Sequence, residues 1–316
     1  MGAFRTVFTD CDLDLSALER VFRENGVEYR LLACKTPAEV IREAGGLEII
    51  MNQYVPLGEE VFAGLPELKA VVRHGVGVNH IDLAAAARHG VKICNVPDGS
   101  THEVADHAMA LLLALARKIV PLDRKVRDGR WTYLDAAPLF RLSACTAGVI
   151  GLGRIGSAFA ARARAFGMRI LAFDEIVRAR GGAPDYVELT DLDAILRESD
   201  FISVHCPQEG NLNLIGTGEM ARMKKTACII NVSRGGIVNE DDLAAALREG
   251  RLGGAALDVF LREPVSPASP LLGLDNFICT PHIAFYTETS LADLAVKVAE
   301  EVVRYFKGQP LRCPVN

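Results

Sequence analysis

The chain has 316 residues, half of them hydrophobic, and a formal net charge of −5. A chain of this length usually forms more than one core, so we expect two domains. Because acidic and basic residues are interspersed, the sequence predicts no basic face for direct binding to nucleic acid.

The cysteines and the apolar segments indicate the cellular compartment in which we expect the protein. The eight cysteines are scattered without a C-x-x-C pair, which favours reduced thiols, and we predict no metal site. The most apolar stretch, Ala108 to Ala116, is too short to cross a bilayer, and we find no secretory signal. We therefore expect a cytoplasmic protein with no membrane partner.

The first hundred residues alternate between strand-like runs and helical segments. Segments such as residues 14–26, whose apolar residues recur at helical spacing, separate runs that are rich in strand-forming residues. This alternation predicts βαβ units around a parallel sheet. The predicted strands lie in the runs 5–9, 28–34, 47–52, 69–75 and 91–96.

A long helix is predicted over residues 100–119, where Ala, Met and Leu suit burial on most sides, and we expect it to bridge two domains. A second series of strands and helices follows, which again predicts a parallel α/β sheet. Its predicted strands lie in the runs 146–156, 169–174, 201–207, 227–236, 253–260 and 276–282.

A final amphipathic helix is predicted over residues 289–308, ending at a glycine. If this helix packs back onto the first domain, that domain is discontinuous. We then expect a first domain of residues 1–98 and 288–316, with a second domain, residues 99–287, between them.

A glycine-rich loop, Gly151-Leu152-Gly153-Arg154-Ile155-Gly156, follows an apolar strand and runs into a helical segment. In a dinucleotide site the first glycine permits a tight turn, the second lets the backbone approach a pyrophosphate, and the third allows close packing of helix on strand. Asp174, at the end of the next strand, can accept both ribose hydroxyls of NAD and would repel a 2′-phosphate. The loop therefore predicts NAD, while Arg178 and Arg180 leave NADP as an alternative. The competing interpretation is a structural turn with an N-cap acid.

Three charged residues follow successive strands of this second series. Because ligands of open α/β sheets bind beyond the carboxyl ends of the strands, Arg234, Glu263 and His282 are expected to face one crevice. Reduction of a 2-keto acid needs a hydride at C2, a proton for its oxygen and a cation for the carboxylate. The guanidinium fork suits the carboxylate, and a histidine beside a carboxylate suits the proton transfer. The trio therefore predicts a 2-keto acid reductase.

Each member of the trio also has a structural interpretation: a loop cation, a solvated acid and a strand-end histidine. Their joint occurrence after successive strands favours the catalytic interpretation. His205 competes for the proton-transfer role, but no acid stands at a comparable strand end, so we interpret His205 as structural.

The segments GLGRIG, INVSRGGIV, AALDVF, EP and TPHIA, with VADHAMALLLALAR, resemble the D-isomer-specific 2-hydroxyacid dehydrogenases over nearly the whole chain. VRHGVGVNHID and PHIAFYTE are most similar to phosphoglycerate-dehydrogenase-like enzymes and C-terminal-binding-protein corepressors. The resemblance implies two doubly wound parallel-sheet α/β domains, a flavodoxin-like substrate domain and a Rossmann NAD domain.

The resemblance also implies roles for single residues. Arg234 would bind the substrate carboxylate, His282 would be the acid/base, and Glu263 would set its protonation. Asp258 would hold the nicotinamide carboxamide. Further cofactor contacts would be Cys206, Pro207, Asn211, Val232 and Ala284, and further substrate contacts Tyr54, His74 and the backbone amides of Gly75, Val76 and Gly77.

The sequence departs from the family pattern at two places. Asn79 stands where the family usually has aspartate, and the loop PQEGNLNLI is one residue shorter than usual, which makes Asn211 the less secure cofactor contact. Neither departure touches the trio.

We therefore predict an NAD-dependent D-2-hydroxyacid dehydrogenase acting on a small 2-keto or 2-hydroxy acid. The alternative is an NAD(H)-sensing, corepressor-like interaction protein of the same fold. A phosphoglycerate dehydrogenase with an effector domain is less favoured because the chain ends soon after its last helix. The helix from Glu103 and the segment 129–140 match the family's dimer-forming region, so we expect a homodimer.

Overall fold

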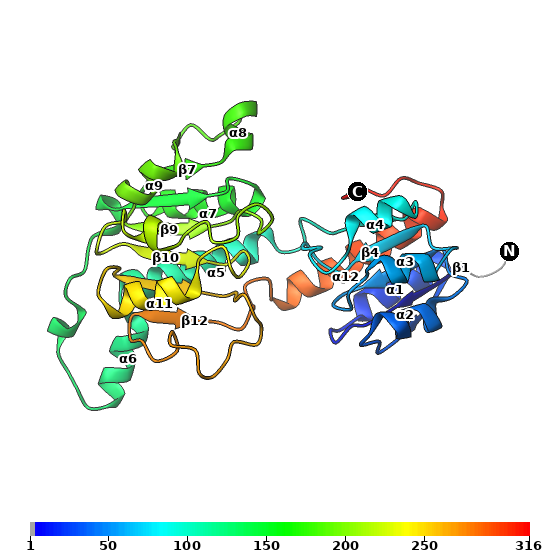
Figure 1. The fold of residues 1–316 in the computed structure, drawn as a ribbon, viewed down its shortest axis with the longest axis horizontal. Helices are drawn as coiled ribbons and strands as arrows, with labels where there is room; N and C mark the ends of the chain where they lie inside the picture. The colour runs from blue at the N-terminus through cyan, green and yellow to red at the C-terminus, as the bar shows by residue number, and fades with distance from the viewer. Residues whose placement is uncertain (1–3) are drawn as a thin grey trace. The chain divides into compact units, whose positions relative to one another are not determined.

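The computed structural model describes residues 4–316, which divide into two compact units. Unit 1 combines the chain up to Ser100 with Tyr286–Asn316, and unit 2 is Thr101–Phe285. Both are built on wholly parallel sheets alternating with helices, which confirms the predicted α/β class (Figure 1). Among the described residues, no helix is both long and apolar enough to span a membrane.

Unit 1 is built on a five-stranded sheet with the strand order β2-β1-β3-β4-β5. Its strands are β1 (Phe4–Phe8), β2 (Val27–Leu31), β3 (Ile49–Asn52), β4 (Ala70–Arg73) and β5 (Lys92–Cys94). Its helices are α1 (Ser16–Asn25), α2 (Pro37–Ala44), α3 (Glu59–Gly64), α4 (Leu83–Arg88) and α12 (Glu288–Phe306).

The distant helix α12 completes one side of this sheet. It packs against α1 and contacts β3 and β4, and Val298 and Val302 are fully buried there together with Phe22 of α1. The apolar stripe predicted for residues 289–308 is therefore a core face. Burying such side chains stabilises unit 1 by roughly 1.5–3 kcal/mol each.

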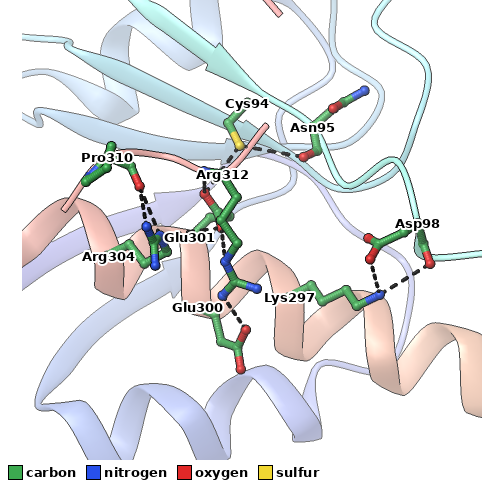
Figure 2. A network of polar contacts seen from close by, with 9 residues as sticks. All are labelled: Cys94, Asn95, Asp98, Lys297, Glu300, Glu301, Arg304, Pro310 and Arg312. Atoms are coloured by element: carbon green, nitrogen blue, oxygen red, sulfur yellow. Dashed lines mark hydrogen bonds and ion pairs between the residues drawn. The ribbon is translucent and has the colours of Figure 1, made fainter. Parts of the chain in front are cut away.

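A buried acid fixes the end of α12 to the chain that follows it. Glu301 is 3% exposed, and its carboxylate accepts hydrogen bonds from the Arg312 amide at 2.9 Å and the Cys94 thiol at 3.5 Å. The Arg312 guanidinium lies 2.8 Å from the other oxygen, and Arg304 binds the Pro310 carbonyl (Figure 2). The segment after α12 is thereby held beside β5.

Unit 2 is built on a seven-stranded sheet with the order β12-β11-β10-β9-β6-β7-β8. Its strands are β6 (Thr146–Ile150), β7 (Arg169–Phe173), β8 (Val187–Leu189), β9 (Phe201–Val204), β10 (Cys228–Asn231), β11 (Gly254–Leu257) and β12 (Phe277–Cys279). Its helices are α5 (Thr101–Ala116), α6 (Ile119–Arg127), α7 (Arg154–Ala165), α8 (Glu175–Arg180), α9 (Leu192–Glu198), α10 (Thr217–Met220) and α11 (Glu240–Arg248), with the short 3₁₀ turns η1 (Tyr133–Ala136) and η2 (Leu142–Ala144).

The long helix predicted over residues 100–119 is α5, and it belongs to unit 2. It packs on α7 and contacts β10 and β11, with Ala105, Ala108 and Leu112 fully buried. The small side chains allow this close approach between helix and sheet. The lysine that follows, Lys118, has a left-handed backbone (φ 50°) and separates α5 from α6.

Candidate active site

Most of the residues predicted for the cofactor and for catalysis stand at one edge of the seven-stranded sheet. The glycine loop follows β6, Asp174 follows β7, and Pro207 lies beyond β9. Carboxyl ends of parallel strands lie at the same edge, where open α/β sheets bind ligands. The same edge carries the three predicted catalytic residues, which follow β10, β11 and β12: Arg234, Glu263 and His282.

The glycine loop has the geometry that a pyrophosphate needs. A Cβ at Gly156 would lie 2.0 Å from the Gly151 carbonyl oxygen, so only glycine allows α7 to pack this closely on β6. A Cβ at Gly153 would meet no atom within 4 Å, and Gly153 caps α7 without a side-chain hydrogen bond. The first-turn amides of α7 therefore border open space that suits a phosphate group. Arg154 is exposed and Ile155 half-buried beside it.

Asp174 links the glycine loop to the next helix. One carboxylate oxygen accepts a hydrogen bond from the Leu152 amide at 2.8 Å, and the other accepts from the Val177 amide at 2.9 Å and caps α8. Asp174 is therefore an N-cap acid, as the structural interpretation predicts, but this role does not exclude cofactor binding. A carboxylate has about four acceptor positions, and half-buried Asp174 keeps capacity for ribose hydroxyls. The residues present fit NAD.

His282 and Glu263 form a hydrogen-bonded pair. The Nδ1 atom of His282 lies 2.7 Å from one Glu263 oxygen, and the Phe260 amide donates to the other at 2.9 Å. Burial raises the pKa of Glu263, but the hydrogen bonds from His282 and Phe260 and the charges of His282 and Arg234 oppose it, so the net pKa is lowered. Since an ionised carboxylate only accepts, Nδ1 of His282 carries the proton of this hydrogen bond.

Arg234 interacts electrostatically with Glu263 of this pair. Burial lowers the pKa of the Arg234 guanidinium, and the charge of Glu263 counteracts that shift. The loops after β10 and β11 come together because residue 235 is glycine: a Cβ there would lie 1.9 Å from the Phe260 carbonyl carbon. The arginine donates to the Ser233 carbonyl at 2.7 Å. One half-buried cation therefore lies near the acid–histidine pair.

The remaining predicted cofactor contacts differ in accessibility. Pro207 is exposed, whereas Cys206, Val232 and Ala284 are buried, and the Asn211 amide donates to the Pro207 carbonyl at 2.9 Å. The side chain of Asp258 is completely buried. That burial argues against the predicted direct contact between Asp258 and the nicotinamide carboxamide.

In unit 1, the predicted substrate contacts divide into two groups. Tyr54 is 56% exposed, and in the described residues the amides of Val76 and Gly77 donate to no acceptor, beside a left-handed Gly75 (φ 133°). These three positions can offer donors to a carboxylate. His74 cannot: it is 3% exposed, its ring packs edge-on against Phe8, and burial lowers its pKa to about 3. The prediction for His74 is corrected to a packing role.

Two residues near the trio were not predicted. The hydroxyl of Thr280 lies 2.5 Å from Asp258 Oδ1 and 2.9 Å from His107 Nε2. Thr280 stands two residues before His282, a position that could have drawn attention. His107 is 173 residues from Thr280 along the chain, and no local pattern connects them.

A cavity of about 340 Å³ lies elsewhere in unit 2. Its lining includes Phe201 and Cys228, the first residues of β9 and β10, and Phe140. It therefore borders the amino ends of the strands, at the sheet edge opposite to the trio, and is not the predicted active site.

Comparison with known proteins identifies the family. The model of the D-isomer specific 2-hydroxyacid dehydrogenase NAD-binding domain matches residues 109–284. The chain is 40% identical to a D-3-phosphoglycerate dehydrogenase of Archaeoglobus fulgidus over 93% of its own length, but spans 56% of that relative. It is 40% identical to a glyoxylate reductase of Korarchaeum cryptofilum, covering 87% of this chain and 83% of the relative. A glycerate dehydrogenase of Methylorubrum extorquens is 35% identical, with 97% of both chains covered.

Solved structures give the same result. The TT0316 protein of Thermus thermophilus is 33% identical with a TM-score of 0.87, over 99% of this chain and 100% of that chain. A D-lactate dehydrogenase of Aquifex aeolicus, solved with NAD and lactic acid, is 28% identical with a TM-score of 0.83 over 96% of both chains. The predictions of fold, NAD cofactor and an oxidoreductase acting on the CH–OH group of 2-hydroxy acids are confirmed. The chain belongs to the D-isomer specific 2-hydroxyacid dehydrogenase family.

Proposed function

We propose that the protein reduces small, unphosphorylated 2-keto acids. The first candidates are glyoxylate and hydroxypyruvate, the 2-keto acid that is reduced to glycerate. The relatives named glyoxylate reductase and glycerate dehydrogenase, 40% and 35% identical to this chain, support this choice. The observation that carries the proposal is the 2.7 Å bond between His282 and Glu263, with Arg234 in electrostatic contact.

The trio divides the chemistry among three side chains. Arg234 binds the substrate carboxylate through its planar fork and polarises the adjacent carbonyl. His282 holds its Nδ1 proton against Glu263, which leaves Nε2 as the nitrogen that gives a proton to the C2 oxygen. Glu263 stabilises the imidazolium from which that proton comes. Bound NADH supplies the hydride.

The roles of the two units belong to the same proposal. The NAD-binding domain is residues 99–287, and the substrate domain is residues 1–98 and 288–316. In the NAD domain the amides between Gly151 and Gly156 would hold the pyrophosphate, and Asp174 would accept hydrogen bonds from the ribose hydroxyls. In the substrate domain the amides of Val76 and Gly77 and the side chain of Tyr54 contact the substrate.

We also propose that the protein is a cytoplasmic homodimer. The segment between α6 and η2 exposes several large apolar side chains, which water solvates poorly. These side chains are close to one another in the sequence. Trp131 is 87% exposed and Tyr133 85% exposed. Eight free cysteines fit a reducing compartment.

The test is turnover of a panel of 2-keto acids with NADH, followed by the loss of NADH absorbance, for the parent protein and for His282→Ala. We expect turnover by the parent protein and a loss in kcat of about 10²- to 10⁴-fold in the variant, the usual contribution of a positioned acid. A His282→Ala variant within twofold of the parent would remove the acid/base role. NADH binding without turnover of any keto acid would favour the NAD(H)-sensing interaction protein.

A further inference from the structure

The backbone of His282 is held in a conformation that residues other than glycine seldom adopt. Its φ is 54°, in the left-handed region, which costs about 1–2 kcal/mol for a side chain with a Cβ. Its amide donates to the Asp258 carbonyl at 2.8 Å, and the next two amides, of Ile283 and Ala284, donate to the Asp258 carboxylate at 2.9 Å each. One residue at the end of β11 thus binds three successive amides of the loop that carries His282.

Asp258 is itself oriented by two side chains. Its Oδ1 atom lies 2.5 Å from the Thr280 hydroxyl, which lies 2.9 Å from Nε2 of His107, and that nitrogen is 3.7 Å from the same carboxylate oxygen. The carboxylate accepts only, so the single hydroxyl proton of Thr280 goes to Asp258. The Thr280 oxygen must then accept from His107, and the network assigns the proton to Nε2 of His107.

We propose that His107 and Thr280 are positioning residues that aim the imidazole of His282 by fixing Asp258. This inference rests on the proposed acid/base role of His282. Without the Thr280 hydroxyl, the buried carboxylate loses an orienting donor and can turn. The amides of Ile283 and Ala284, which donate to this carboxylate, then lose their fixed acceptor, and the loop can leave its left-handed conformation. A displacement of about 1 Å at a reacting group can cost on the order of 10²-fold in rate.

The matched pair Thr280→Val and Thr280→Ser tests the hydroxyl at nearly constant shape. We expect Thr280→Val to lose about 10- to 100-fold in kcat, while KM for the keto acid and the Kd for NADH change less than about threefold. Thr280→Ser, which keeps the hydroxyl, is expected to recover most of that loss. An equal loss in both variants, or a Thr280→Val variant that chiefly loses NADH affinity and thermal stability, would overturn the proposal.

His107 provides a second test that does not depend on the folding of a Thr280 variant. His107→Gln keeps a side-chain N–H donor and His107→Leu does not, so kcat should fall further in the leucine variant. In the parent protein, the nitrogen-15 spectrum of His107 should show Nε2 protonated. An unprotonated Nε2 would reverse the network and overturn the proposal.

His282→Ala measured in the same series separates this inference from the proposed function. If His282→Ala is inactive while Thr280→Val and His107→Leu stay within twofold of the parent in kcat, the positioning proposal is wrong and the catalytic role stands. If His282→Ala keeps the activity of the parent, the acid/base role assigned to His282 in the proposed function is wrong, and the network has no catalytic group to position.

Discussion

Histidines in this protein occupy different environments, and each environment determines what the side chain can do. His74 is buried and His205 is half-buried, and desolvation lowers the pKa of each to about 3, so both are neutral at physiological pH. His282 has a 43% exposed side chain and a carboxylate partner. His282 thus combines access to a ligand with a group that stabilises its charged form. His89 also pairs with a carboxylate, that of Glu59 at 2.7 Å, but it belongs to unit 1 and not to the ligand edge of the seven-stranded sheet.

Burial of neutral His74 should make the protein sensitive to acid. The unfolded chain binds a proton at this residue below about pH 6.5, whereas the folded protein does not until about pH 3. The unfolded state binds more protons across this window, so the stability contribution is complete above pH 6.5 and falls with decreasing pH, by at most about 1.4 kcal/mol per unit.

His74→Phe, which keeps a ring against Phe8, should remove that dependence. We expect the drop in unfolding free energy between pH 7 and pH 5 to be about 2 kcal/mol smaller in the variant than in the parent. Denaturant unfolding at the two pH values, followed by circular dichroism, measures it. Equal drops in both proteins would contradict a neutral His74.

Arg234 should not be replaceable by lysine. A point charge cannot reproduce two parallel hydrogen bonds to a carboxylate, so Arg234→Lys is expected to lower kcat/KM by about 10- to 100-fold at unchanged NADH affinity. Steady-state kinetics with a keto acid measures this loss. The same substitution at exposed Arg248, on α11, is the control and should have no effect. An unchanged kcat/KM in Arg234→Lys would move the carboxylate site elsewhere.

At the scale of elements, the glycine loop between β6 and α7 makes two separable contributions. Gly156 is required for packing and Gly153 only for the approach of a ligand, since a Cβ meets an atom at 2.0 Å at Gly156 and none within 4 Å at Gly153. Gly156→Ala should therefore be destabilised and lose NADH binding. Gly153→Ala should keep the parent's melting temperature and lose at least about tenfold in NADH affinity, a difference of about 1.4 kcal/mol.

Thermal denaturation and NADH fluorescence titration distinguish these two effects. The two alanine variants act as controls for each other because they differ by three positions in one loop. If Gly153→Ala bound NADH like the parent, the pyrophosphate would not lie on this loop.

The sequence predicted the elements better than it predicted contacts between them. Periodicity identified the strands that line the ligand edge and the apolar stripe of α12, because a stripe or a buried run is a local property. It did not identify β8, a strand of three residues, or α6, which has no buried residue. At the site, motifs placed the trio, but the burial of His74 and the His107–Thr280 contact depend on distant chain segments. Local patterns carry no signal for such contacts.

At the scale of the whole molecule, the exposed apolar side chains between α6 and η2 are the candidate interface of the proposed homodimer. Trp131 and Tyr133 are almost fully exposed in the single chain, and Phe140 is 52% exposed. If the proposed homodimer forms through this segment, Trp131→Asp should shift the protein from dimer to monomer, because the interface would then have to bury a charge at this position. Light scattering coupled to size-exclusion chromatography measures the mass.

NADH affinity provides the control for that variant, since the glycine loop lies outside the segment. Retained affinity together with monomer mass is the expected result. A dimer of unchanged stability in Trp131→Asp would place the interface elsewhere.

The return of α12 to unit 1 has a consequence for synthesis on the ribosome. The surface of α1 and of the five-stranded sheet that α12 covers emerges with the first hundred residues, but its cover is translated only after all of Thr101–Phe285. Unit 2 has its whole sequence in one piece and can fold as it emerges. Until then the apolar face of nascent unit 1 is uncovered and prone to aggregation. We therefore expect a chaperone to bind this face during synthesis.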